Sequence, residues 1–258
     1  MNRDFTVRKY KELLDAFKKA GYEFQTVESY VKKPINRVVV LRHDVDSWPQ
    51  NALQMAELEN ELGIKSTYYF RKSWLSFQER IVQKIVGYGY EIGYHYEDLS
   101  VAKGNYEKAI KRFSENLSFF RQYYPVTTIA MHGRPLSKYD SKDLWNKYNY
   151  HSYGLLAEPY LDFDFNEILY LTDTGNRWDG GKYSIRDCVR SKYAYNIHTT
   201  DELIKHIRGG LLPNKIMLNV HPARWNDDYF KWMLRYYILT LPKLFIKKTV
   251  KRRRKNTL

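Results

Sequence analysis

Short apolar segments of β type alternate with segments of helical period along this chain, and this alternation strongly limits the folds it can adopt. Residues 38–41 form a β-branched run, and residues 51–62 have helical period after Pro49 and stop at Gly63. The same order of strand and helix recurs further along the chain. We therefore predict an α/β fold with a parallel sheet, and 258 residues suit a single (β/α) barrel.

The pattern also predicts where the other elements lie. Strands are expected at 66–70, 90–95, 127–131 and 215–220, with weaker candidates at 161–165 and 168–171. Helices are expected at 78–86, 106–123, 201–207 (capped by Thr200) and 229–241. No repeat or linker separates them, so we expect one domain over residues 1–242 and a basic C-terminal tail over 243–258.

Positive charge is concentrated in this tail. Residues 243–258 hold eight Lys/Arg and no Asp/Glu, and the remaining 35 Lys/Arg and 29 Asp/Glu leave a net charge of +6 elsewhere. Nucleic-acid binding is therefore poorly supported. The tail is interpreted either as disordered chain after a last helix, or as an anchor on anionic lipid, where each basic residue contributes about 1 kcal/mol.

Cysteine content and hydropathy indicate the compartment. Cys188 is the single cysteine, which excludes a disulfide framework and suits a reducing environment. The N-terminus shows no apolar signal region, and no apolar run approaches the roughly 18 residues of a spanning helix. We expect a cytoplasmic protein, peripheral at the inner membrane surface if the tail is an anchor.

Four histidines occupy related positions. His43, His95, His132 and His221 each lie at or just past the C-terminal end of a predicted strand. Barrel enzymes place their catalytic groups at that edge, because parallel strands all end on one face. Any one of these histidines could instead belong to the core or cap a loop, but the four together predict an active site.

Two aspartates strengthen this prediction. Asp44 and Asp46 are two residues apart, so their side chains point to the same side of an extended backbone. Two carboxylates that lie so close together repel each other unless a cation lies between them or they share a proton. A metal ion held by one of them would leave the other free as a base. The alternative is that Asp46, with Ser47, only caps the helix near Pro49.

The motifs around these residues resemble the polysaccharide deacetylase (NodB-homology) family, carbohydrate esterase family 4. The phrases that carry the resemblance are 44–46, 62–70, 89–95 and 218–221, within a matching region of about 36–225. The resemblance implies a distorted (β/α) barrel, a divalent metal, most often zinc, and hydrolysis of acetyl groups on glycans. It makes Asp44 the general base, Asp46 a metal ligand and His221 the general acid.

One position departs from the family pattern. The family's second motif supplies two metal-binding histidines spaced i and i+4, and His95 matches the first. The second position is Leu99, which cannot bind a metal. His132, at the end of the next strand, is the first candidate to replace it, and Glu97 is the second. Asp, His and His with an open position would suit a hydrolytic zinc site.

Several short segments resemble a divergent subgroup associated with bacterial surface-polysaccharide (O-antigen type) biosynthesis. They are residues 132–137, 158–162, 170–175, 177–180 and 219–222. Asp173 and Trp178 fall where the family often keeps an aspartate and a tryptophan lining the groove. The resemblance implies that Asp173 orients a catalytic residue and that Trp178 stacks on a sugar, although Asp173 could simply form a turn. Arg134 is a candidate to bind a substrate carboxylate or phosphate, or to hold Asp44.

These observations favour a metal-dependent hydrolase that removes an acetyl group, N-acetyl before O-acetyl, from a glycan or a nucleotide- or lipid-linked sugar. The alternative is a degenerate barrel that binds a glycan or lipid-linked intermediate without turnover, because the histidine at position 99 is missing. A third hypothesis is a protein that binds nucleic acid or a membrane surface through its tail.

Overall fold

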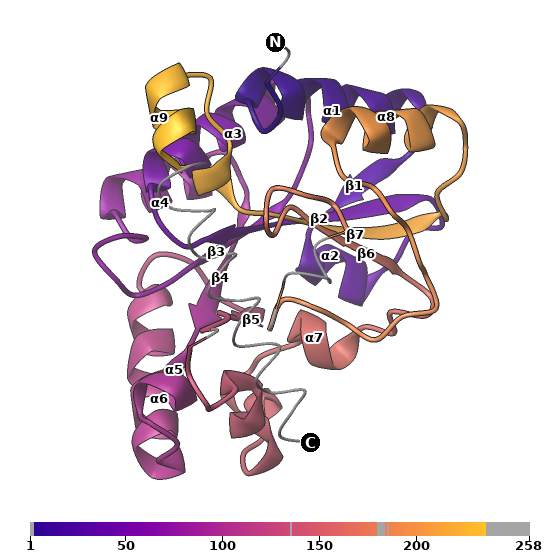
Figure 1. Ribbon diagram of the computed structural model, residues 1–258. Helices are drawn as coiled ribbons and strands as arrows, with labels where there is room; N and C mark the ends of the chain where they lie inside the picture. The colour runs from indigo at the N-terminus through magenta and orange to yellow at the C-terminus, as the bar shows by residue number, and fades with distance from the viewer. Residues whose placement is uncertain (1–2, 135, 180–183, 185, 236–258) are drawn as a thin grey trace.

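Seven parallel strands form one sheet at the centre of the protein (Figure 1). The computed structural model describes residues 3–134, 136–179, 184 and 186–235. The strands are β1 (Glu23–Gln25), β2 (Val38–Val45), β3 (Thr67–Phe70), β4 (Glu91–Tyr96), β5 (Ile129–Met131), β6 (Leu169–Thr172) and β7 (Lys215–Val220). The strands predicted at 38–41, 66–70, 90–95, 127–131, 168–171 and 215–220 are thus confirmed.

The sheet runs in the order β5-β4-β3-β2-β7-β6, and β1 pairs with the first half of β2. Within the described residues, β5 and β6 do not pair with each other, so the barrel is open between them. On the β5 side of this opening, Thr128 forms a parallel bridge with Ala157. The chain is therefore a single-domain α/β protein with a distorted, incompletely closed (β/α) barrel, as predicted.

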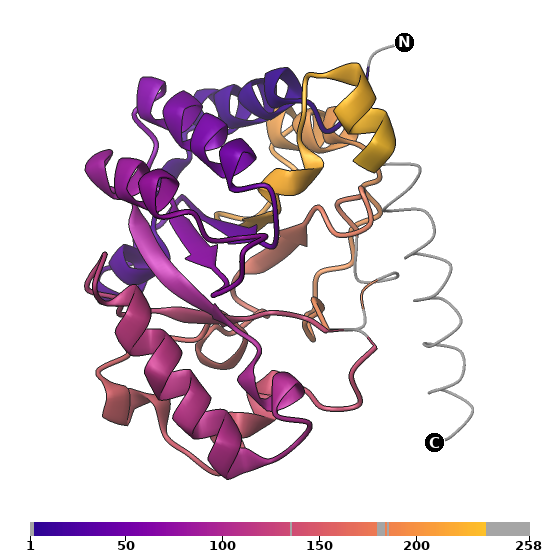
Figure 2. The same ribbon diagram turned by 90° about the vertical axis from the view of Figure 1, so that its left-hand side faces the viewer.

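Helices cover the outside of the sheet. They are α1 (Val7–Lys19), α2 (Val27–Lys32), α3 (Pro49–Glu61), α4 (Glu79–Gly87), α5 (Asp98–Val101), α6 (Tyr106–Phe120), α7 (Pro159–Asp162), α8 (Thr200–Arg208) and α9 (Tyr229–Met233), with short 3-10 turns at Ser141–Asn146, Tyr150–Tyr153 and Pro222–Arg224. α1 and α8 lie side by side (Figures 1 and 2). No helix in the described part of the chain is long and apolar enough to cross a membrane.

Three local predictions need correction or completion. The strand predicted at 161–165 is wrong: Glu158 caps the short helix α7, and Pro159 occupies its first position. The cap of α8 is Thr199, which forms a capping box with Glu202, and Thr200 is already helical. Of the helix expected at 229–241, α9 is described, whereas residues 236–242 and the tail 243–258 lie outside the described residues.

The central strand β2 is buried along its whole length and has two different faces. Val40 belongs to an apolar cluster that includes residues of β3 and β7, whereas Leu41 packs in the cluster that includes α1. Because side chains alternate along a strand, Arg42 and Asp44 share the inner face with Val40, and His43 shares the outer face with Leu41.

His43 consequently lies outside the predicted active site. Its Nε2 is 2.8 Å from the carboxylate of Glu59 on α3. Glu59 is completely buried and also accepts hydrogen bonds from Tyr10, Ser66 and Tyr68. This group of polar side chains, which we call the Glu59 cluster, joins α1, β2, α3 and β3 behind the sheet. The role of His43 is structural.

The Glu59 cluster leads to a prediction about stability. Glu59→Ala would leave several buried donors without an acceptor, and loss of one partner of a buried charged network costs about 3–5 kcal/mol. We expect a loss of this size in the free energy of unfolding measured with urea. Glu61→Ala, on the exposed side of the same helix, is the matched control and should change it little. Equal stability of the two variants would contradict the role of the cluster.

Candidate metal centre and catalytic groups

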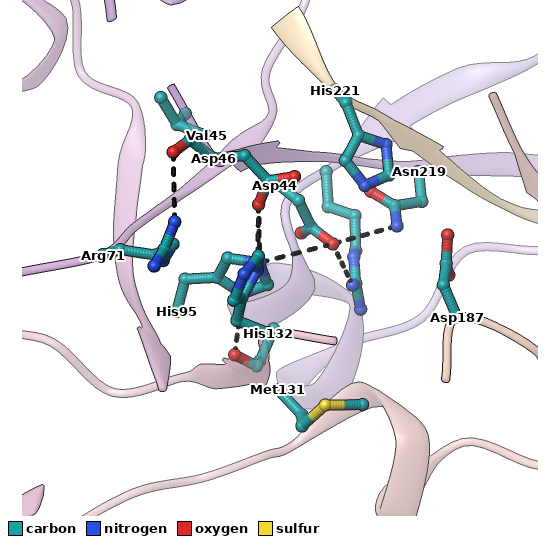
Figure 3. Close-up of polar contacts among 12 residues, drawn as sticks. Asp44, Val45, Asp46, Arg71, His95, Met131, His132, Asp187, Asn219 and His221 are labelled. Carbon is teal, nitrogen blue, oxygen red and sulfur yellow. Dashed lines mark hydrogen bonds and ion pairs between the residues drawn. The ribbon is translucent and has the colours of Figure 1, made fainter. Parts of the chain in front are cut away.

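The C-terminal ends of β2, β4, β5 and β7 meet around a cavity of about 60 Å³. Its lining includes five of the residues predicted from sequence: Asp44, Asp46, His95, His132 and His221. Figure 3 shows the first four pointing toward one another, with His221 beside them. The remaining lining residues are Met131, Gly133, Tyr160, Thr174, Ser184, Arg186, Asp187 and Arg224.

Three of these side chains form a group that could hold a metal ion. Asp46 Oδ1 lies 2.9 Å from His132 Nδ1 and 3.5 Å from His95 Nε2. His95 Nε2 and His132 Nδ1 are 3.2 Å apart. Ligand atoms about 2.0–2.1 Å from a tetrahedral zinc ion lie about 3.4 Å from one another, so these spacings fit such an ion.

The protonation of the two imidazoles suits this use. His95 Nδ1 is 2.9 Å from the carbonyl oxygen of Ala130, which can only accept, so Nδ1 carries the proton and neutral His95 presents a lone pair at Nε2. Burial lowers the pKa of His132 despite the nearby carboxylate of Asp46, which favours its neutral form. Burial opposes ionisation of Asp46, but His132 outweighs it and holds the pKa of Asp46 well below its usual range.

Glu97, the second candidate ligand, lies behind His132 and outside the group. Its Oε1 accepts a 2.7 Å hydrogen bond from Arg71, and its Oε2 is 4.0 Å from His132 Nε2. Burial opposes its ionisation, but His132 and Arg71 lower the pKa of Glu97. Leu99 is 1% exposed and packs in an apolar core cluster. Position 99 therefore contributes to packing and does not line the cavity.

Asp44 is held rigidly by one of its two oxygens. Arg42 donates a 2.7 Å hydrogen bond to Oδ2, and the Asn219 amide donates another of 3.0 Å. Oδ1 is buried and has no hydrogen-bond partner among the described residues. Burial opposes ionisation of Asp44, but the guanidinium of Arg42 outweighs it and lowers the pKa. The carboxylate is therefore charged at neutral pH, with one oxygen available.

His221 is oriented by Asp173, as the resemblance implies. Asp173 Oδ1 is 2.6 Å from His221 Nδ1, and its Oδ2 accepts hydrogen bonds from the backbone NH of His221 and from Trp225 Nε1. Burial and Arg224 act against protonation of His221, but Asp173 outweighs them and raises the pKa. The pair leaves Nε2 as the nitrogen of His221 that can exchange a proton with a ligand.

Trp178 is placed differently from the sequence-based expectation. Of the two expectations for Arg134, the contact with Asp44 is wrong, and the binding of a substrate carboxylate or phosphate stays a prediction. Trp178 is 2% exposed, stacks with Phe5 and donates from its indole nitrogen to Thr200, so it belongs to the core and is not placed to stack on a sugar. The side chain of Arg134 is 45% exposed and its Nη1 lies 3.6 Å from Glu97 Oε2. Arg42, and not Arg134, holds Asp44.

Sequence reasoning also missed Asp187, a half-buried carboxylate in the lining of the cavity. It accepts hydrogen bonds from the hydroxyls of Tyr160, Tyr170, Thr172 and Thr174. Burial opposes its ionisation, but His221 and the hydroxyls of Thr174 and Tyr170 keep the pKa of Asp187 far below its usual range. With all these donors, Asp187 stabilises the wall of the cavity. No periodic pattern marks it, because it lies in an irregular segment.

Arg42 and Asn219 could have been found from the sequence. Arg42 precedes Asp44 by two residues and Asn219 precedes His221 by two, so each lies on the same strand face as a predicted catalytic residue. The register between β2 and β7 then places Arg42 opposite Asn219.

The ligand group yields a test with zinc. We expect His132→Ala to lower zinc affinity by orders of magnitude, because it removes one of three ligand atoms, and Glu97→Ala to lower it about 10–100-fold at most, as partners of metal-bound histidines do. Equilibrium competition with a chromophoric chelator measures both. His151→Ala, a histidine bonded to Leu155 away from the cavity, is the control. Full zinc occupancy in His132→Ala would show that His132 is not a ligand.

Comparison with known proteins gives a similarity at the level of structure alone. No protein-family model and no curated protein matches the chain. It is similar to a wild-type CE4 family pseudoenzyme from Bacillus anthracis and to a mutant of it with restored enzymatic activity, both at 12% identity over 83% of this chain, with TM-scores of 0.41 and 0.42. The chain spans 64% and 66% of those structures.

A further similarity is to the CE4 domain of a multidomain xylanase from the hindgut metagenome of Trinervitermes trinervoides. Identity is again 12%, over 84% of this chain and 85% of that one, with a TM-score of 0.37. These structures include pseudoenzymes, and the similarities show no activity for this chain.

Proposed function

We propose that this protein is a metal-dependent hydrolase that removes an acetyl group, N-acetyl in preference to O-acetyl, from a sugar intermediate of surface-polysaccharide biosynthesis. The main support is that one cavity is lined by all the groups this reaction needs. They are the ligand group of Asp46, His95 and His132, the carboxylate of Asp44, whose Oδ1 has no partner among the described residues, and His221. At about 60 Å³ the cavity has room for only a few water-sized groups, which suits an acetyl group and a water.

The proposed metal is zinc, because two imidazole nitrogens and one carboxylate oxygen with an open position are typical of hydrolytic zinc sites. A bound zinc ion supplies Lewis-acid polarisation of a carbonyl and lowers the pKa of a nearby water toward about 7. The protein's part is to hold three ligand atoms at these spacings and to provide the groups that move protons.

Asp44 is the proposed general base. Its Oδ2 is occupied by Arg42 and Asn219, so a proton taken from the attacking water would go to Oδ1, which has no partner among the described residues. His221 is the proposed general acid and would give a proton from Nε2 to the departing amine. Its raised pKa keeps a larger fraction protonated near neutral pH, as an acid requires.

Two substitutions separate the roles of the neighbouring aspartates. Asp44→Asn should keep zinc and lower acetate release by about 10²–10⁴-fold, the usual contribution of a general base. The Asp46→Ala variant should no longer bind zinc. Acetate release from a panel of N- and O-acetylated sugars, nucleotide-linked and lipid-linked forms included, is measured beside metal content, with the surface variant Asp15→Asn as control.

The opposite pattern, with zinc lost in Asp44→Asn and kept in Asp46→Ala, would reverse the two roles. A wild-type protein that holds zinc stoichiometrically and yet releases no acetate from any member of the panel would contradict the proposed reaction. Absence of both zinc and turnover would favour the alternative of a barrel that binds a sugar without acting on it.

The pH dependence tests His221 separately. As a general acid His221 acts in its protonated form, so activity should fall as pH rises through its pKa, which is raised in the folded protein. Asp173→Asn removes the carboxylate that raises this pKa, and the alkaline limb of the kcat/KM profile should move to lower pH. An unchanged alkaline limb with reduced kcat would show that another group sets it.

A further inference from the structure

Large apolar side chains are unusually exposed around the mouth of the barrel. Trp74, after β3, is 85% exposed; Leu136, after β5, is 72% exposed; and Phe230, in α9 after β7, is 74% exposed. Since all strands are parallel, the segments that follow their C-terminal ends lie on the face that carries the cavity. The three side chains thus come from three segments that surround the candidate site.

Further exposed apolar side chains lie next to Trp74 and Phe230 in the chain. Leu75 is 40% exposed beside Trp74, and Tyr229 and Leu234 are 53% and 43% exposed on either side of Phe230. We call these six residues the mouth patch: Trp74, Leu75, Leu136, Tyr229, Phe230 and Leu234. Exposed apolar side chains gathered on one face of a protein indicate contact with a partner or a membrane, whereas scattered ones do not.

The charge of the same segments identifies the partner. Residues 71–78, 132–140 and 221–235 together hold seven Lys/Arg and three Asp/Glu, and the tail 243–258 adds eight Lys/Arg. Most of the chain's net charge of +14 therefore belongs to the mouth segments and the tail. Aromatic side chains among basic residues suit the headgroup region of an anionic bilayer, where tryptophan and tyrosine concentrate.

We propose that the mouth patch docks this protein on an anionic membrane surface, with the cavity facing the lipid headgroups. Trp74, Leu136 and Phe230 enter the interface, and the exposed lysines of the same segments, Lys72, Lys138 and Lys231, contact the lipid phosphates. This orientation rests on the proposed function in one respect only: it would present the cavity to a sugar carried on a lipid. The docking itself requires no turnover.

The experiment is flotation of the full-length protein with phosphatidylcholine vesicles, with and without phosphatidylglycerol. Wild type should bind the anionic vesicles, and Trp74→Ser/Phe230→Ser should bind them at least about tenfold more weakly, since burying each side chain favours binding by at least that factor. Leu211→Ser is the matched control. Leu211 is 61% exposed but precedes β7, at the opposite end of the barrel, so its variant should bind as wild type does.

A second measurement locates the contact. Brominated acyl chains should quench the tryptophan fluorescence of the wild-type protein when it is bound to vesicles. The Trp74→Phe variant should still bind, but its fluorescence should be quenched much less. Acetate release from a water-soluble substrate should be the same in Trp74→Ser/Phe230→Ser and wild type, which separates this proposal from the proposed function.

Three outcomes would overturn the proposal. The first is failure of wild type to bind anionic vesicles. The second is equal binding by wild type and Trp74→Ser/Phe230→Ser, including the case in which only deletion of 243–258 weakens binding. The third is that substitution of the mouth patch changes the oligomeric state and leaves vesicle binding unchanged. This outcome would identify a second copy of the chain as the partner.

Discussion

The alternation of side chains along β2 is the constraint on which both the stability and the chemistry of this protein depend. One face of the strand carries Arg42 and Asp44 into the barrel, and the other carries His43 to the buried carboxylate of Glu59. A shift of one residue in the pairing of β2 would exchange these faces and place His43 in the cavity and Asp44 against α3. The Glu59 cluster therefore does more than join helices to the sheet. It fixes the register that turns Asp44 toward the candidate metal centre.

Charge balance explains why so many carboxylates can be buried at one end of a small barrel. Asp44 is paired with Arg42 and accepts from the amide of Asn219, and Asp173 is bonded to the ring and the backbone NH of His221 and to Trp225. The Asp46 carboxylate lies within 3.5 Å of the imidazoles of His95 and His132, and His95 already donates its Nδ1 proton to Ala130. A divalent cation would supply the counter-charge for Asp46, which is the physical reason for proposing a metal centre there.

Most helices and strands could be predicted because hydrophobic periodicity and turn residues depend on the local sequence alone. The strand at 215–220 has the predicted bounds, since a mainly apolar run between Pro213 and Pro222 has the length of a strand and is too short for a typical helix. The error at 161–165 has the same origin: Leu161, Phe163 and Phe165 alternate like a strand, but Pro159 and the cap Glu158 start a helical turn just before them. Irregular segments gave no such signal. Trp178 was expected in the groove from the family resemblance alone, because the sequence does not show which surface buries an aromatic side chain.

In the proposed ligand group, His132 would take the place of the metal-binding histidine that position 99 does not supply, without a change of architecture. The register between β4 and β5 pairs His95 with Ala130, whose carbonyl accepts the Nδ1 proton of His95. The backbone NH of His132, two residues further along, is bonded to the carbonyl of Tyr96. Each histidine is thus fixed to the strand of the other, and the two ring nitrogens meet at 3.2 Å. These hydrogen bonds orient both imidazoles in the proposed ligand group, while Leu99 packs in the apolar core.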